Sequence, residues 1–166
     1  MWWFRRALIL VALAAAGCGF QPLYGQRGGQ SVGDQMAATR IGVIEDRTGQ
    51  QLRNALLTEL QPNGPVGTTR YTLEVKLTQS ISQLAVAKDE TTSRASVEIR
   101  ASYALKRIED GRVLFEGVSR AASSYNIVAS NFATVAAEAD ARRRTIRVVG
   151  EDMKVQLGAF FNRAGG

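Results

Sequence analysis

The sequence predicts an α+β fold: a two-layer sandwich in which two helices pack on one face of a mixed four-stranded sheet, in the order β-α-β-β-β-α. Three observations lead to this prediction. Two stretches have the three- and four-residue apolar spacing of amphipathic helices. Between and before them, apolar and polar residues alternate as in strands with one buried face. An Asp-Gly step, which is favoured in tight hairpin turns, joins two of the alternating stretches.

The first strand and the first helix lie in the first half of the chain. Residues 39–45 form a short stretch rich in β-branched side chains, which predicts the first strand. From Gln50 the apolar residues Leu52, Leu56 and Leu60 share one helical face. Thr48 or Asp46 can act as the N-cap. The Pro-Asn-Gly-Pro stretch at 62–65 ends the helix.

Three strands follow. Residues 71–77 alternate clearly, and the alternation continues weakly to Ile81; the longest alternating stretch is 95–106, and a return strand runs over 113–125. Residues 88–92 read as a loop, and 109–112 read as the hairpin turn. Because the first helix is a crossover, the first two strands are predicted to be parallel, and the last three form an antiparallel meander.

A long amphipathic helix from about Ser130 closes the domain, with Ser130 or Asn131 as its N-cap. Its arginines have acidic partners four residues earlier, from Glu138 to Arg142 and from Asp140 to Arg144. Because each strand has one apolar face, we expect both helices to cover that face. The other sheet face then stays polar and exposed, as a docking surface.

The first 38 residues differ in character from this domain. Arg5 and Arg6 precede a short apolar run of small residues that ends at Cys18, the one cysteine of the chain, which is the pattern of a secretory signal. The sequence therefore divides into a cleaved signal peptide at 1–17, a flexible Gly-rich tether at 18–38 and a single domain at 39–163.

The segment before Cys18 has three possible interpretations. A membrane-spanning helix would need about 20 apolar residues, and the two arginines interrupt the run. Ordinary signal cleavage would leave an unpaired thiol in an oxidising compartment. The third is that residues 15–18, Ala-Ala-Gly-Cys, resemble the lipobox of bacterial lipoproteins. That resemblance implies acylation of Cys18 and, because Gly19 and not an aspartate follows, an outer-membrane location.

The composition argues against catalysis. The chain has no histidine, which removes the commonest general base, the commonest zinc ligand and any Ser-His nucleophile. A carboxylate hydrolase would have to use Asp89-Glu90 or Glu109-Asp110, which lie in predicted turns. We therefore expect no enzyme, no metal and no cofactor. The chain carries 21 basic against 15 acidic residues, and export makes a nucleic-acid partner improbable.

Several short motifs, in this order and spacing, resemble the LptE family of lipopolysaccharide-assembly lipoproteins. They are the mature start at 18–24 (CGFQPLY), Arg53-Asn54 with Leu52 and Leu56, Tyr71 with Leu73, Ser124-Tyr125-Asn126, Phe132-Ala133, Glu138 and Asp140-Ala141. The resemblance implies an outer-membrane lipoprotein, anchored on the periplasmic side, that plugs an LptD-type β-barrel, helps it fold and contacts lipopolysaccharide. The alternative is an independent periplasmic envelope- or lipid-binding lipoprotein without a barrel partner.

Basic side chains near the long strand are the candidates for lipopolysaccharide contact, because guanidinium and ammonium groups bind phosphate strongly. We select Lys88, Arg94, Arg100 and Arg120; Arg94 and Arg100 are six residues apart and share one sheet face. The alternative is that these cations pair with Glu98 or Glu74 across the sheet. Tyr125 and Asn126, which match the family motif, are candidates for partner contact or for shaping the turn into the last helix.

Overall fold

The computed structural model describes residues 31–65, 67–84 and 93–164. It confirms the predicted fold class: a four-stranded mixed sheet with helices packed against it, preceded by one additional short helix. The elements in chain order are α2 (Val32–Ala37), β1 (Thr39–Ile41), α3 (Asp46–Leu60), β2 (Tyr71–Leu84), β3 (Ser93–Arg107), β4 (Val113–Ile127) and α4 (Asn131–Ala164).

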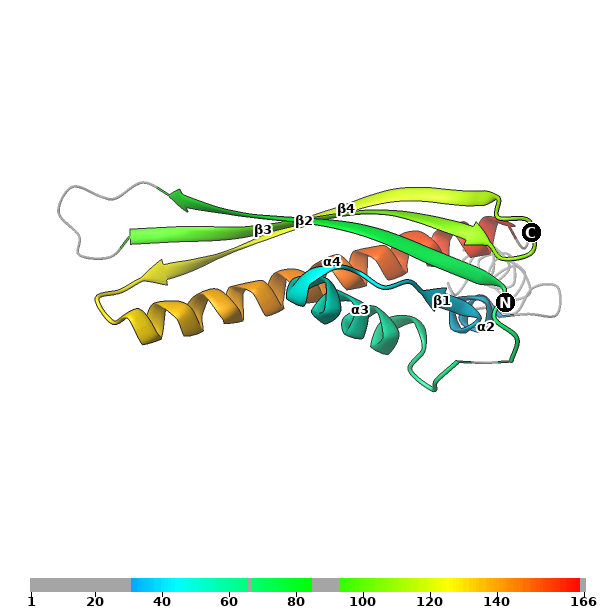
Figure 1. The fold of residues 1–166 in the computed structure, drawn as a ribbon, viewed down its shortest axis with the longest axis horizontal. Helices are drawn as coiled ribbons and strands as arrows, with labels where there is room; N and C mark the ends of the chain where they lie inside the picture. The colour runs from blue at the N-terminus through cyan, green and yellow to red at the C-terminus, as the bar shows by residue number, and fades with distance from the viewer. Residues whose placement is uncertain (1–30, 66, 85–92, 165–166) are drawn as a thin grey trace, which may run out of the picture.

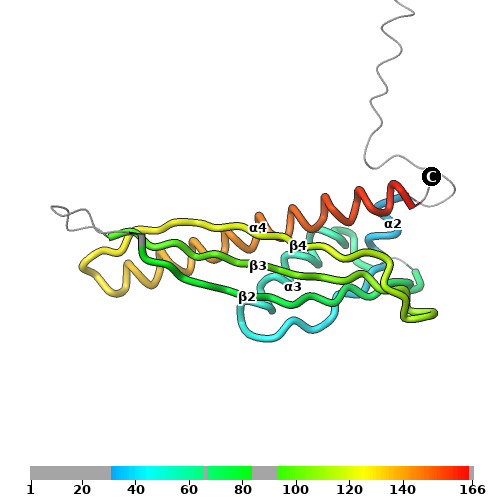
Figure 2. Tube along the Cα trace, turned by 90° about the horizontal axis from the view of Figure 1, so that it is seen from above, coloured from blue at the N-terminus to red at the C-terminus, as the bar shows by residue number. Residues whose placement is uncertain are grey.

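The sheet has the order β1-β2-β3-β4. Strand β1 is parallel to β2 and pairs only with the first three residues of β2, Tyr71, Thr72 and Leu73. Strands β2, β3 and β4 form the predicted antiparallel meander, and they run side by side along the molecule (Figure 2). Most of the sheet therefore consists of three long strands, with β1 covering only one end of the β2 edge.

Helices α3 and α4 both lie on one side of the sheet, as predicted (Figure 1). Helix α4 runs beneath the whole length of the strands, and its 34 residues correspond to about 50 Å. Helix α3 lies beside α4 under the part of the sheet nearest β1. The buried core between the layers consists mainly of Leu52 and Leu56 of α3, Leu73 of β2, alternate residues of β3 from Val97 to Leu105, and Val149, Met153, Leu157 and Phe161 of α4.

Helix α2 lies in residues that the sequence analysis assigned to the tether. A capping box forms it: the Ser31 hydroxyl accepts from the Asp34 amide at 3.0 Å, and the Asp34 carboxylate accepts from the Ser31 amide at 3.2 Å. Val32 and Met36 are buried in the core. The helix is short and lies among polar residues, so its few apolar side chains do not repeat often enough to indicate a helix in the sequence. The described folded part thus begins at Ser31.

Two helix starts can be compared with the predictions. Helix α3 begins at Asp46, with Glu45 as an N-cap that makes no side-chain bond, so neither Asp46 nor Thr48 is the N-cap. At the start of α4, the Ser130 hydroxyl accepts from the Ala133 amide at 3.4 Å, as expected for the predicted cap. Helix α4 continues through Gly150 without a break. No helix in the described ranges is long and apolar enough to cross a membrane.

Candidate functional site

The sheet face away from the helices is the predicted docking surface, and we call it the outer face. On β2 and β3 it consists of the even-numbered side chains, and the register continues this row onto β4. Its charged members are Lys76, Arg94, Arg100, Lys106 and Arg120, and Glu74, Glu98 and Glu116. The remaining positions carry mostly Ser, Thr and Ala, so the charged side chains are surrounded by small ones.

Two arginines oppose each other on the outer face: Arg100 of β3 is directly paired with Arg120 of β4. Like charges in directly opposed positions destabilise a strand pair. Glu98 lies 3.5 Å from Arg120, whereas among the described residues no acidic side chain forms an ion pair with Arg100. Because guanidinium groups bind phosphate oxygens in a bidentate way, this pair is suited to an anion that carries several negative oxygens.

Arg94 also lies on the outer face, which confirms that it shares a face with Arg100. The Asn126 side-chain oxygen, directly across on β4, accepts a hydrogen bond from Arg94 Nε at 3.3 Å. Asn126 is neutral, so Arg94 keeps its net charge. By contrast, Lys106 pairs with Glu74 at 2.6 Å. Among the predicted cations, the alternative of cross-sheet pairing thus holds in part for Arg120, which lies near Glu98, whereas Glu74 pairs with Lys106, which was not a candidate.

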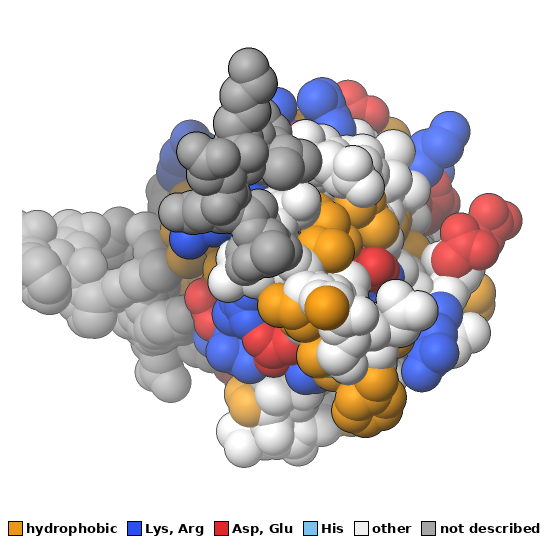
Figure 3. Space-filling model, turned by 90° about the vertical axis from the view of Figure 1, so that its left-hand side faces the viewer, with side chains coloured by type: hydrophobic (Ala, Val, Ile, Leu, Met, Phe, Trp, Pro, Cys, Tyr) orange, Lys and Arg blue, Asp and Glu red, His pale blue; other side chains and the backbone are white. Residues whose placement is uncertain are grey.

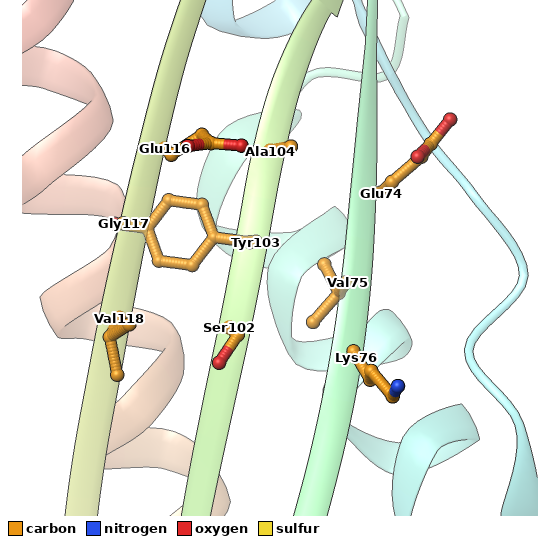
Figure 4. Close-up of a pocket in the computed structure, with 9 residues that line it drawn as sticks. All are labelled: Glu74, Val75, Lys76, Ser102, Tyr103, Ala104, Glu116, Gly117 and Val118. Carbon is orange, nitrogen blue, oxygen red and sulfur yellow. The ribbon is translucent and has the colours of Figure 1, made fainter. Parts of the chain in front are cut away.

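A shallow hollow of about 680 Å³ lies across β2, β3 and β4, toward the end of the sheet where a turn joins β3 to β4. Its lining residues come from three strands: Glu74, Val75, Lys76, Ser102, Tyr103, Ala104, Glu116, Gly117 and Val118 (Figure 4). The small side chains of Ser102 and Ala104 and the bare backbone of Gly117 keep this region open. The hollow mixes two carboxylates with one ammonium group, so the more basic part of the outer face is the neighbouring region around Arg100 and Arg120.

Tyr125 points the other way, toward the helices, where it is half-buried against the core. Burial, followed by the charge of Glu138 and a hydrogen bond to it, raises the pKa of the Tyr125 hydroxyl above its usual value, although Arg142 opposes this shift. Glu138 also forms an ion pair with Arg142. Tyr125 therefore ties β4 to the first part of α4, and its neighbour Asn126 orients Arg94.

The end of the molecule where α4 begins carries unusually exposed apolar side chains. Phe132 is 85 % exposed and Val135 is 66 % exposed, while Val128 precedes them at 40 %. Figure 3 looks onto this end and shows hydrophobic side chains gathered among charged ones. A Phe that is almost fully solvated contributes little to the core, so packing within the described chain does not account for it.

The structure places the predicted site residues on two different faces of the sheet. Arg94, Arg100, Arg120 and Asn126 share the outer face, whereas Tyr125 lies on the helix side. Cys18 and Lys88 fall outside the described residues. The sequence analysis missed the direct opposition of Arg100 and Arg120. The Asp-Gly step alone did not reveal it, because the β3 and β4 register shifts by one residue between Leu105 and Lys106, and this shift brings Arg100 opposite Arg120.

Of the carboxylates considered for a hydrolase, the structure describes Glu109 and Asp110 in the turn between β3 and β4. Asp110 accepts hydrogen bonds from the Arg107 side chain at 3.3 Å and from the Arg112 amide at 3.1 Å, which is the behaviour of a turn residue. Asp89 and Glu90 lie outside the described residues. In the described part of the chain, no three His, Cys, Asp or Glu side chains are grouped as they would be around a metal ion.

Solved structures share this fold at low sequence identity. A protein from Caulobacter crescentus CB15 is 16 % identical, with a TM-score of 0.65, over 79 % of this chain and 96 % of that one. The minor lipoprotein from Acinetobacter baumannii is also 16 % identical, with a TM-score of 0.55, over 75 % and 93 %. Rare lipoprotein B from Shewanella oneidensis is 10 % identical, with a TM-score of 0.50, over 76 % and 96 %. No curated protein matches the sequence.

The family comparison is the more specific finding. The model of the LptE family, described as lipopolysaccharide-assembly, matches residues 36–157, which include every strand of the described sheet, all of α3 and most of α4. The role of this family is assembly without catalysis, in agreement with the prediction that the chain is not an enzyme. The protein therefore belongs to the LptE family of lipopolysaccharide-assembly proteins.

Proposed function

We propose that this protein is an outer-membrane lipoprotein of the lipopolysaccharide translocon. In this role it acts as plug and assembly factor for an LptD-type β-barrel and contacts lipopolysaccharide during its insertion into the outer leaflet. Family membership supports the assembly role. An elongated body about 50 Å long, built on the 34-residue helix α4, has a shape that suits the lumen of a large barrel.

Acylation of Cys18 supplies the anchor in this proposal. The signal-like segment and the single cysteine support it. The described part of the domain begins at Ser31, and residues 18–30 of the predicted tether lie outside the described residues. In this proposal they connect the acyl chains to α2 and so hold the domain at the periplasmic surface of the outer membrane.

The single observation that supports lipopolysaccharide contact most strongly is the Arg100 and Arg120 pair on the outer face. A lipid A phosphate between the two guanidinium groups would replace their repulsion with two charge-assisted contacts. Arg94, held by Asn126, adds a third cation on the same face. Lys88 is proposed as a further contact on the basis of its charge and its place in the chain between β2 and β3.

Contact with the barrel is proposed for residues that match the family motif and remain exposed. Asn126 lies on the outer face, and Phe132 is 85 % exposed at the start of α4. Burial of this Phe against a partner would remove a large apolar surface from water. Tyr125 contributes indirectly, because it packs the end of β4 onto α4.

Binding of purified lipopolysaccharide to the full mature chain tests the anion site. We expect the double charge reversal Arg94→Glu with Arg100→Glu to weaken binding about a hundredfold, since each of the two lost charge-assisted contacts is worth about a factor of ten. The matched control is Arg47→Glu with Arg147→Glu, which changes the net charge equally but lies on the helices.

The salt dependence of lipopolysaccharide binding is a second measurement in the same assay. Phosphate contacts should weaken as ionic strength rises, because salt screens exposed charges. Equal affinity of the sheet variant and the helix control, across a salt series, would contradict the assignment of the outer face.

A further inference from the structure

The two edges of this sheet are protected differently. In β2 the Leu73 carbonyl accepts from the Gly42 amide at 2.9 Å, which shows that the backbone groups of Leu73 point toward β1. Backbone groups alternate along a strand. The N–H and C=O groups of alternate residues from Val75 to Gln83 therefore point to the same side. There β1 has already ended at Ile41, and no described strand pairs with this stretch.

The opposite edge, formed by β4, is covered by α4. The Arg144 side chain donates to the Ser124 carbonyl at 3.2 Å, and the Gln156 side chain donates to the Val118 carbonyl at 3.4 Å. The register places both carbonyls on the side of β4 away from β3. In the described part of the chain, then, one sheet edge is occupied by helix side chains and the other remains open.

The open edge also lacks the residues that usually prevent strand addition. Natural edges carry charges, prolines or bulges, whereas residues 77–83 read Leu-Thr-Gln-Ser-Ile-Ser-Gln, without a charge or a proline. The β2 and β3 register runs through this stretch without a bulge. Ile81, on the helix side of the sheet, is 47 % exposed. A hollow of about 450 Å³ adjoins the edge between residues 43–46 and 75–77.

We infer that the β2 edge from Leu77 to Gln83 is a strand-addition site whose occupant is the same segment of a second copy of this chain, antiparallel about a two-fold axis at Ser80. The stretch is self-complementary in this register. Gln79 opposes Ile81 of the second copy, Leu77 opposes Gln83, and Thr78 opposes Ser82, so no like charges meet. Residues with outward-pointing backbone groups face each other and exchange both backbone hydrogen bonds.

The protection of β4 explains why the assembly stops at two copies. Pairing of the β2 edges uses the edge that is open among the described residues of each copy, and the two edges of the joined sheet are then β4 strands covered by α4 side chains. An isologous contact of this kind closes, whereas two open edges on each copy would permit a growing fibre. The inference does not depend on the proposed barrel partner.

Disulfide trapping tests the geometry, because Cys18 is the one native cysteine of the chain. At the two-fold axis the Ser80 positions form a non-hydrogen-bonded pair, with Cα atoms about 4.5 Å apart, which is within the range of a disulfide. We expect Ser80→Cys in the full mature chain to form a covalent dimer under mild oxidation. Ser102→Cys, exposed on the same face but in the interior strand β3, should stay monomeric. The double variant Thr78→Cys with Ser82→Cys should also cross-link.

Sedimentation of the full mature chain in detergent provides the independent measurement. We expect a concentration-dependent dimer, and Ser80→Lys should abolish it by placing two ammonium groups together, whereas Ser102→Lys should leave it intact. A monomer at every concentration, a dimer insensitive to Ser80→Lys, or equal cross-linking at Ser80 and Ser102 would overturn the inference. Cross-linking of Ser80→Cys only to a different polypeptide would also overturn it, since the occupant would then not be a second copy.

Discussion

The close approach of Tyr103 to Gly117 makes a sharp test of the packing between sheet and helix. Tyr103 of β3 is 4 % exposed, and its hydroxyl donates to Gln156 of α4 at 2.7 Å. Its ring passes over Gly117 of β4 (Figure 4). A Cβ added at Gly117 would lie 2.5 Å from both Cζ and the hydroxyl oxygen of Tyr103. The ring must therefore move in a Gly117→Ala variant.

The cost of that movement follows from two contributions. Loss of the hydrogen bond to Gln156 costs about 1 kcal/mol, and an overpacked core costs roughly 1–3 kcal/mol. We expect Gly117→Ala to lower the free energy of unfolding by about 2–4 kcal/mol, measured by urea denaturation. In a Tyr103→Leu background, where the ring is absent, the same Gly117→Ala change should cost much less. A cost below about 0.5 kcal/mol in the native background, or an equal cost in both backgrounds, would refute this reasoning.

Three further predictions rest on other contacts. Gly150→Ala should raise the free energy of unfolding by about 1 kcal/mol, since alanine favours the helix and the added Cβ would lie 3.8 Å from the nearest side chain. A lower free energy of unfolding would show that the interface cannot hold the added methyl group. Lys154→Ala should cost about 1 kcal/mol by removing the 2.9 Å ion pair with Glu59 that joins α4 to α3. Because the pKa of Tyr125 is raised in the folded state, it ionises more readily when unfolded, so stability should fall as pH rises above about 10. Tyr125→Phe should flatten that decline, and an unchanged pH profile would exclude the contribution of Tyr125.

Much of the fold could be predicted because the apolar periods are long and regular. The alternation in β3 and the three- and four-residue spacing around Val149 and Met153 each extend over many residues, so the order of apolar and polar residues alone identifies the buried faces. The Asp-Gly turn indicates that β3 and β4 are neighbours, but their register also depends on a one-residue shift between Leu105 and Lys106 that the sequence does not reveal. Helix α2 was missed because six residues give too short a period. The start of α3 was misplaced because its cap makes no side-chain bond.

The candidate site was predicted only in part, because it depends on contacts between strands. The shared face of Arg94 and Arg100 follows from spacing alone. The bond from Arg94 to Asn126 and the opposition of Arg100 to Arg120 follow from the register. The contact of Arg144 with the β4 edge could not be predicted. In the sequence, the spacing of Arg144 and Asp140 indicates an ion pair along the helix, and nothing indicates that Arg144 also donates to the Ser124 carbonyl.

The proposed plug role predicts a stoichiometric partner, and co-purification from outer membranes tests it most directly. The acylated chain should be recovered from detergent-solubilised outer membranes in a one-to-one complex with a large β-barrel, and Phe132→Ser should reduce that recovery, whereas Val155→Ser, at a residue also exposed on α4, should not. Recovery only as the free chain or as a dimer of itself, with no barrel protein bound, would contradict the account.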